Sequence, residues 1–158
     1  MTTGAYAFAA RVAGAWLVVL AAIPGAVSPA EAQILQVQPT TITFPSSDPD
    51  TVPQIAASPI RVSYLAQGSS NNPWTITVRA EGNLVSGAAT IPISTISWTA
   101  TPTPTFRDGT LSTVAQTLAT GTGFINVNRG DVTFRFVNSW THPVGNYTQT
   151  ITFTLSSP

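Results

Sequence analysis

The segment at residues 143–155 reads PVGNYTQTITFTL, and it decides the fold. Four threonines share one parity, and the apolar residues share the other, namely Tyr147, Ile151, Phe153 and Leu155. Successive side chains of a β-strand point to opposite faces, so one face of this segment suits a core and the other suits water. The segment is therefore predicted to be a two-faced strand that the chain enters through a turn at Pro143 and Gly145.

The same alternation recurs along the chain between clusters of turn-forming residues. Residues 74–81 place Trp74 on an apolar face, residues 60–64 alternate in the same way, and residues 132–136 carry Phe134 and Phe136 on one face. We count seven or eight short strands after residue 32 and no convincing helix. Regularly spaced short strands with Gly or Pro at most joints predict an all-β, antiparallel sandwich with these aromatic residues in its core.

Three local breaks in the pattern have structural meaning. Residues 34–44 read as one edge strand that Pro39 interrupts, because proline cannot donate to a ladder. The apolar phase shifts between Ile93 and Ile96, which predicts a β-bulge near residues 94–95. Residues 128–131 read Asn-Arg-Gly-Asp and predict a hairpin turn, and turn geometry explains the Arg-Gly-Asp tripeptide better than an adhesion motif does.

Residues 1–32 have the three parts of a secretory signal peptide. The single charge Arg11 precedes an apolar core at residues 12–23, and small residues end in Ala30-Glu31-Ala32. We expect a signal helix that is cleaved after Ala32, which leaves one domain at residues 33–158. The apolar core is shorter than the roughly 20 residues of a membrane span, and the alternative is an uncleaved anchor helix. The expected location is secreted or at the surface of a bacterial cell, with the periplasm as a further option.

Charge and cysteine content narrow the function classes. The chain has six basic residues, six acidic residues, a net charge of zero and no cysteine. It has no basic field for nucleic acid, so nucleic-acid binding is not expected. Without disulfides, the stability of an exported domain has to come from sheet packing. No segment after residue 32 is apolar enough to span a membrane, so no membrane association is expected after cleavage.

The turn and strand at residues 143–155, together with Asn72-Pro73-Trp74 opening another strand, resemble bacterial immunoglobulin-like β-sandwich domains of exported and cell-surface proteins. The resemblance implies a tyrosine corner, in which the Tyr147 hydroxyl bonds to the backbone a few residues upstream. A looser similarity links the chain end to WxL-type surface domains. Phe153 stands where those domains carry tryptophan, and no Trp-x-Leu motif follows, which argues against wall binding by that route.

Residues with catalytic or metal-binding chemistry are sparse. His142 is the only histidine, it lies in a predicted turn, and the chain has neither cysteine nor a Gly-x-Ser-x-Gly elbow. Asp48 and Asp50 have the spacing of half a calcium loop, but Pro49 separates them and the later ligands are missing. We therefore expect no catalytic residues, no metal, no cofactor and no enzymatic activity.

The aromatic residues offer the one candidate ligand surface. Most of them fall on strand phases that also carry aliphatic residues, which favours core packing. Trp140 lies in a predicted loop beside His142, and these two residues are the candidates for ligand binding. The residues expected to be structural are Trp74, Phe134, Phe136, Gly145, Tyr147, Ile151 and Phe153.

The sequence thus predicts an exported, non-enzymatic structural or adhesive surface module. Its apolar segment at residues 33–44 could pair through an edge strand with another copy or with other surface proteins. The alternative is a small carbohydrate-binding module that stacks a polysaccharide on Trp140.

Overall fold

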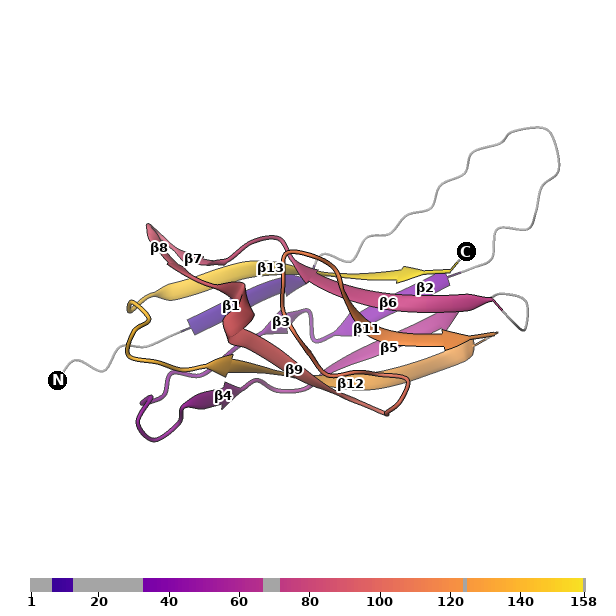
Figure 1. Cartoon of the computed structure of the whole chain (residues 1–158), viewed down its shortest axis with the longest axis horizontal. Coiled ribbons are helices and arrows are strands. Elements are labelled where there is room, and N and C mark those ends of the chain that lie inside the picture. The colour runs from indigo at the N-terminus through magenta and orange to yellow at the C-terminus, as the bar shows by residue number, and fades with distance from the viewer. Residues whose placement is uncertain (1–6, 13–32, 67–71, 124, 158) are drawn as a thin grey trace, which may run out of the picture.

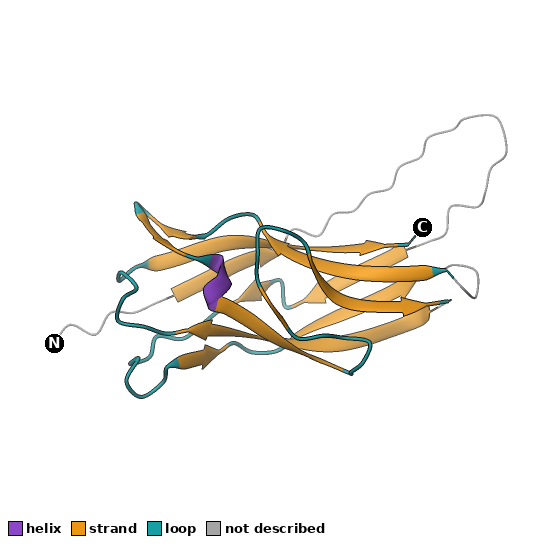
Figure 2. Cartoon of the chain, viewed as in Figure 1, coloured by secondary structure: helices purple, strands orange, loops and turns teal. Residues whose placement is uncertain are grey.

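The chain folds as a β-sandwich of two sheets packed face to face, as predicted (Figures 1 and 2). The computed structural model describes residues 7–12, 33–66, 72–123 and 125–157. Within these residues, the helical content is one short 3₁₀ turn, η1 (Ile93–Thr95), and the remaining elements are strands. The expected all-β class is confirmed, although several strands are so short that the described strands exceed the seven or eight expected.

The first sheet has seven strands among the described residues. They are β1 (Ala7–Val12), β3 (Thr41–Ile42), β6 (Pro73–Ala80), β7 (Leu84–Ser86), β8 (Ala89–Ile91), β11 (Gln116–Thr122) and β13 (Asn146–Ser156). The spatial order is β11-β6-β13-β1-β3, with β7 beside β13 and β8 beside β7. The segment that decides the fold, β13, therefore lies in the middle of this sheet.

The second sheet has six strands in the described part of the chain. They are β2 (Gln33–Gln38), β4 (Gln54–Ala56), β5 (Ile60–Ala66), β9 (Ile96–Thr101), β10 (Gly109–Thr110) and β12 (Ile125–Val137). The spatial order is β10-β9-β12-β5-β2, and β4 extends the pairing of β12 beyond β5. The chain passes from β2 in this sheet to β3 in the other at Pro39, so the predicted interrupted edge strand is confirmed.

Strand β13 has the two faces that its sequence predicts. Tyr147, Ile151 and Phe153 are buried, whereas Thr148 and Thr154 are exposed. The structural residues named from the sequence all lie at or near this core: Trp74, Phe134 and Phe136 are buried as well.

The tyrosine corner is present. Tyr147 donates a hydrogen bond from Oη to the backbone carbonyl oxygen of Pro143, four residues upstream, at 2.7 Å. Gly145 lies between them, and a Cβ added there would be 2.5 Å from the Ser86 hydroxyl oxygen. The loop before β13 therefore packs directly on β7, which explains why this position holds glycine.

Aromatic rings join the two sheets across the core. The Tyr64 ring on β5 lies 4.8 Å from the Trp74 ring on β6, and 6.1 Å from the Phe106 ring. Phe44 and Phe136 approach to 5.8 Å. Tilted aromatic pairs at such distances contribute about 0.5–1.5 kcal/mol each beyond their buried area. These contacts take the place of disulfides in holding the sheets together.

The hairpin turn predicted at residues 128–131 is wrong. Strand β12 runs through these residues, and Gly130 pairs with Val62 of β5. A Cβ on Gly130 would be 2.3 Å from the buried Phe106 ring, so glycine makes room for that ring and does not make a turn. Asp131 pairs with Arg61 on the neighbouring strand at 3.2 Å, so the Arg-Gly-Asp tripeptide lies within a sheet and is not at a hairpin tip.

The phase shift near residue 94 is real, but its cause differs from the prediction. Ile93 and Ile96 are both buried, and the turn η1 between them supplies the extra residues that a β-bulge was expected to supply. A 3₁₀ turn rises less per residue than a strand does, so η1 changes which residues face the core. After the turn, Ile96 and Trp98 are both buried.

The expected signal helix also needs correction where the structure describes it. Residues 7–12 form strand β1, between β13 and β3, and the rest of the predicted signal at residues 1–6 and 13–32 lies outside the described residues. β1 pairs in parallel with Asn146–Ile151 and antiparallel with β3. β13 and β3 both offer backbone donors and acceptors to residues 7–12, which explains why these residues form a strand and not a helix.

Candidate functional site

Asp48, Asp108 and Asp131 serve local structure. The Asp48 carboxylate accepts a hydrogen bond from the Asp50 backbone N–H at 2.9 Å, which closes the turn at residues 48–51. Asp108 accepts from the Ala100 N–H at 2.8 Å, and Asp131 pairs with Arg61. Among the described residues, no group of three or more His, Cys, Asp or Glu side chains is placed to hold a metal ion.

His142 lies in the loop between β12 and β13, as predicted. Its ring lies 5.6 Å from the Phe136 ring, and Nε2 is 3.2 Å from the Val137 carbonyl oxygen. Its backbone N–H donates to the Ser139 carbonyl at 3.1 Å. These contacts hold the loop against the end of β12, so the ring has a clear structural role.

Trp140 is exposed, as its position in a predicted loop implies. Its side chain is 65% exposed, whereas Trp74 and Trp98 are buried. The indole Nε1 donates to the Asp50 carboxylate at 3.0 Å, which ties the β12–β13 loop to the loop that precedes β4. The structure therefore brings Trp140 and Asp50 together at one end of the sandwich.

The same end carries further apolar surface. Val144 is 68% exposed in the loop that holds Trp140, and Val137 at the end of β12 is 45% exposed. Asn138, the first residue of this loop, is buried, and its side-chain amide donates to the carbonyls of Ser47 and Val52 in the loop that precedes β4. The loop around Trp140 is thus bonded to the loop that precedes β4, while the side chains of Trp140 and Val144 face solvent.

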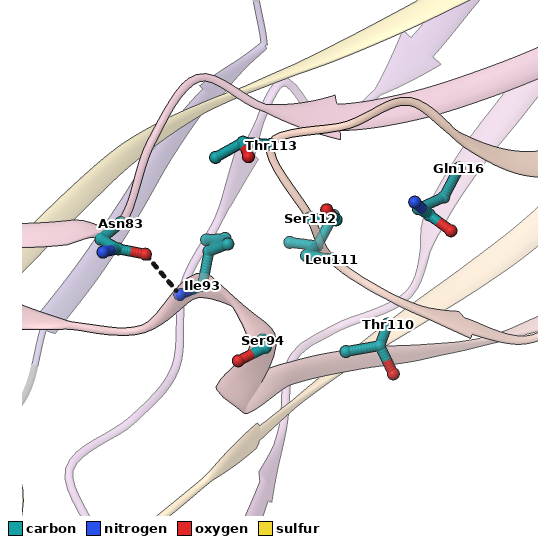
Figure 3. Close-up of a pocket in the computed structure, with 8 residues that line it drawn as sticks. All are labelled: Asn83, Ile93, Ser94, Thr110, Leu111, Ser112, Thr113 and Gln116. Atoms are coloured by element: carbon teal, nitrogen blue, oxygen red, sulfur yellow. Dashed lines mark hydrogen bonds between the residues drawn. The ribbon is translucent and has the colours of Figure 1, made fainter.

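A pocket of about 340 Å³ lies on another part of the surface, between η1 and the segment from β10 to β11 (Figure 3). It is lined by Asn83, Ile93, Ser94, Thr110, Leu111, Ser112, Thr113 and Gln116. The lining has hydroxyl, amide and apolar groups but no titratable side chain. Asn83 is already engaged, because its carboxamide oxygen accepts from the Ile93 N–H at 3.1 Å. Sequence reasoning missed this pocket because three separate segments of ordinary residues form it.

The sheet edges differ in how well they are covered. The outer edge of β11 is bridged by the segment around Phe106, with the Arg107 N–H donating to Leu118 at 2.9 Å and the Thr120 N–H to Thr105 at 3.1 Å. The outer edge of β9 is covered by β10 and by the hydrogen bond from Leu111 to Ile96 at 2.8 Å. Both edges are therefore closed by the chain itself.

Strand β2 is a longer edge with less cover. It pairs with β5 over six residues, and no strand in the described part of the chain pairs with its other side. Ile34 is 55% exposed, and the strand reads QILQVQ without a charge, proline or glycine. Gln33 donates a side-chain hydrogen bond to Ser157, just after the end of β13, and Val37 is buried in the core between the two sheets.

The position of β1 is a second uncommon feature of the sheets. It fills the space between β13 and β3, and its pairing with β13 is the single parallel one in the described ladders. The first residue of the next strand, Gln33, directly follows the predicted cleavage site. No pattern in the sequence indicated this strand, because residues 7–12 lie within the predicted signal peptide.

No protein-family model matches this chain, and no curated protein matches it. No helix among the described residues has the length and apolarity needed to cross a membrane.

Proposed function

We propose that the protein is an exported, non-enzymatic structural or adhesive surface module that assembles through edge-strand pairing. The observation that carries the proposal is β2, a six-residue edge strand with one unpaired side within the described residues. Export is supported by the signal-like residues 1–32, and the immunoglobulin-like kinship is supported by the corner that Tyr147 forms. The non-enzymatic role is supported by acidic side chains that serve local structure.

An open edge strand offers a row of backbone donors and acceptors to another chain. Many monomeric proteins protect such a strand with a lysine, a proline or a bulge within it. β2 has none of these, and its Ile34 side chain adds apolar surface on the exposed face. β2 also carries no charge, and three of its six residues are aliphatic, which favours strand pairing. Pairing with a second copy or another surface protein would complete the ladder.

Sedimentation velocity of the exported protein tests this proposal. We expect the wild-type protein to sediment as assemblies, and Ile34→Lys to sediment as a monomer, since a charge on an edge strand opposes pairing. Val114→Lys is the matched control, because Val114 is 68% exposed on a loop and lies on no strand. Wild-type protein that stays monomeric at high concentration, or Ile34→Lys that assembles like the control, contradicts the proposal.

Export has its own test. Cell fractionation should find the protein outside the cytoplasm, with Gln33 as its N-terminal residue. Recovery of the full-length chain from the cytoplasm would contradict both the location and the predicted cleavage after Ala32.

A second candidate function, carbohydrate binding, is favoured by Trp140. An exposed ring that a hydrogen bond holds in place can stack on a sugar face without losing much side-chain entropy, and the neighbouring Val144 enlarges the apolar surface. Under this candidate, Trp140→Ala abolishes retention on an insoluble polysaccharide, and Val144→Ala weakens it less. Equal retention of wild type and Trp140→Ala on a broad panel of glycans would retire the candidate.

A further inference from the structure

We infer that the space between β13 and β3 is a strand-accepting site. Residues 7–12 fill it in the full chain, and strand β2 of a second copy fills it once those residues are removed. The inference rests on the proposed function, and it names the acceptor and the regulation of the edge pairing. We call this space the β1 slot and define it by Asn146–Ile151 of β13 and Thr41–Ile42 of β3.

The first argument is the position of the occupant. The sandwich of the described chain begins again at Gln33, directly after the predicted cleavage site, and β1 is the one strand that lies before it. Hydrolysis of the Ala32–Gln33 peptide bond by a signal peptidase, with one water giving the new carboxylate and amine, would separate β1 from the rest of the domain. The slot would then lose its covalently attached occupant.

The second argument is what an empty slot would expose. β1 pairs with six residues of β13 and with both residues of β3, so its removal frees backbone donors and acceptors on two strands. The buried side chains Ile42, Tyr147 and Ile151 lie on these same two strands, and each is at most 3% exposed in the full chain. A gap between two open strand edges, with apolar side chains on those strands, favours the entry of another strand.

The third argument selects the occupant. A strand that enters the slot needs two free sides, and β2 is held on one side by β5 and is free on the other within the described residues. Releasing β2 breaks one ladder, whereas entering the slot forms two. β2 and β1 both have six residues, and neither β2 nor the slot residues carry a charge, so length and electrostatics match.

The geometry of assembly follows from this choice. The donor strand β2 and the acceptor slot are different parts of the surface, so each copy can give one strand and receive one. Two copies can exchange β2 reciprocally and close a dimer, or each copy can give β2 to the next in a ring or an open chain. The uncleaved chain would stay unassembled by this route, because its own residues 7–12 occupy the slot.

Cysteine cross-linking tests the inference, and the absence of native cysteine keeps the background clean. Thr148→Cys marks the slot and Gln36→Cys marks β2, and both side chains are exposed in the full chain. The two variants are co-exported and oxidised. We expect a cross-link between a Thr148→Cys copy and a Gln36→Cys copy, and loss of that product when Val114→Cys replaces Gln36→Cys.

The same pair is then compared in a chain whose cleavage is blocked by Ala30→Phe with Ala32→Phe. We expect the cross-link between copies to be lost there, and Ala9→Cys with Thr148→Cys to form a link within one chain, because the two residues face each other in the register. A cross-link between copies that persists without cleavage overturns the inference. Cross-links only between two Gln36→Cys copies also overturn it, while leaving edge pairing and the proposed function intact.

A peptide competition keeps the inference testable if the blocked variants fold poorly. A synthetic peptide of residues 7–12 in excess should dissociate assemblies of the exported protein, and the same peptide with Ala10→Pro should not, since proline cannot donate to a ladder. Assemblies that ignore both peptides, with Ile34→Lys still monomeric, would place the pairing at β2 alone and overturn the slot.

Discussion

Replacing Tyr147 by phenylalanine removes one hydroxyl group and with it the tyrosine corner. The hydrogen bond from Oη to the Pro143 carbonyl is 2.7 Å long, the usual length of a good O–H···O bond. Pro143 is exposed, so water can reach its carbonyl after the substitution, and the loss is close to the net value of one bond. We expect the free energy of unfolding to fall by about 1 kcal/mol, which lowers the Tm by about 4 °C.

Tyr64 provides a matched control with the opposite sign. It is as deeply buried as Tyr147, but its hydroxyl has no hydrogen-bond partner among the described residues. A buried hydroxyl without a partner costs about 1–3 kcal/mol. Tyr64→Phe keeps the ring that packs on Trp74 and removes this cost. We therefore expect Tyr64→Phe to raise the free energy of unfolding by about 1 kcal/mol.

Urea denaturation of the two variants beside the wild type measures both changes, and equal m-values keep the comparison sound. The expected order of midpoints is Tyr64→Phe above wild type above Tyr147→Phe. A Tyr147→Phe variant as stable as the wild type, or a Tyr64→Phe variant that loses stability, would refute the hydrogen-bond assignments on which the reasoning depends.

Three further predictions concern the core, the exposed loop and the response to pH. Gly130→Ala should lower the free energy of unfolding by about 1–3 kcal/mol in urea denaturation, because the new Cβ would lie 2.3 Å from the buried Phe106 ring; a neutral change would contradict that packing. Trp140→Ala should change the free energy of unfolding by less than about 1 kcal/mol, since the Trp140 side chain is mostly exposed. Trp74→Ala should lower it by about 3–5 kcal/mol, because Trp74 is buried, and similar losses in both variants would contradict the assigned burial. Burial raises the pKa of Tyr64 from its ordinary value of 10.0. The stability that the protonated hydroxyl contributes, relative to the ionised one, is therefore present below about pH 10 and is lost as the pH rises through the folded-state pKa. Thermal unfolding from neutral to strongly alkaline pH should show a smaller loss of stability for Tyr64→Phe than for the wild type, and parallel curves would contradict the raised pKa.

The parts of the fold that a period of two determines could be predicted from the sequence. The buried face of β13 and the apolar face of β6 follow from alternation, because strand residues of one parity share one environment, and the exposure of Trp140 follows from its place in a predicted loop. The edge position of β2 was predictable as well, since Pro39 limits pairing at its end.

The parts that depend on distant partners could not be predicted. Residues 128–131 have turn-forming types, yet Gly130 lies within β12 because the ring of Phe106, far away in the sequence, occupies the space above it. The surface pocket gathers residues from three segments that carry no motif. The β1 slot was hidden because residues 7–12 have the composition of a signal peptide, and only the pairing with β13 reveals a second use for them.

Hydrogen–deuterium exchange of the assembled, exported protein tests the central claim most directly. The account predicts that those backbone amides of Asn146–Ile151 that point toward the β1 slot stay protected after residues 1–32 have been removed, and that dilution to monomers makes them exchange quickly. Fast exchange of these amides in the assemblies, or equal protection in the monomer, would contradict the claim that a strand from a second copy fills the β1 slot.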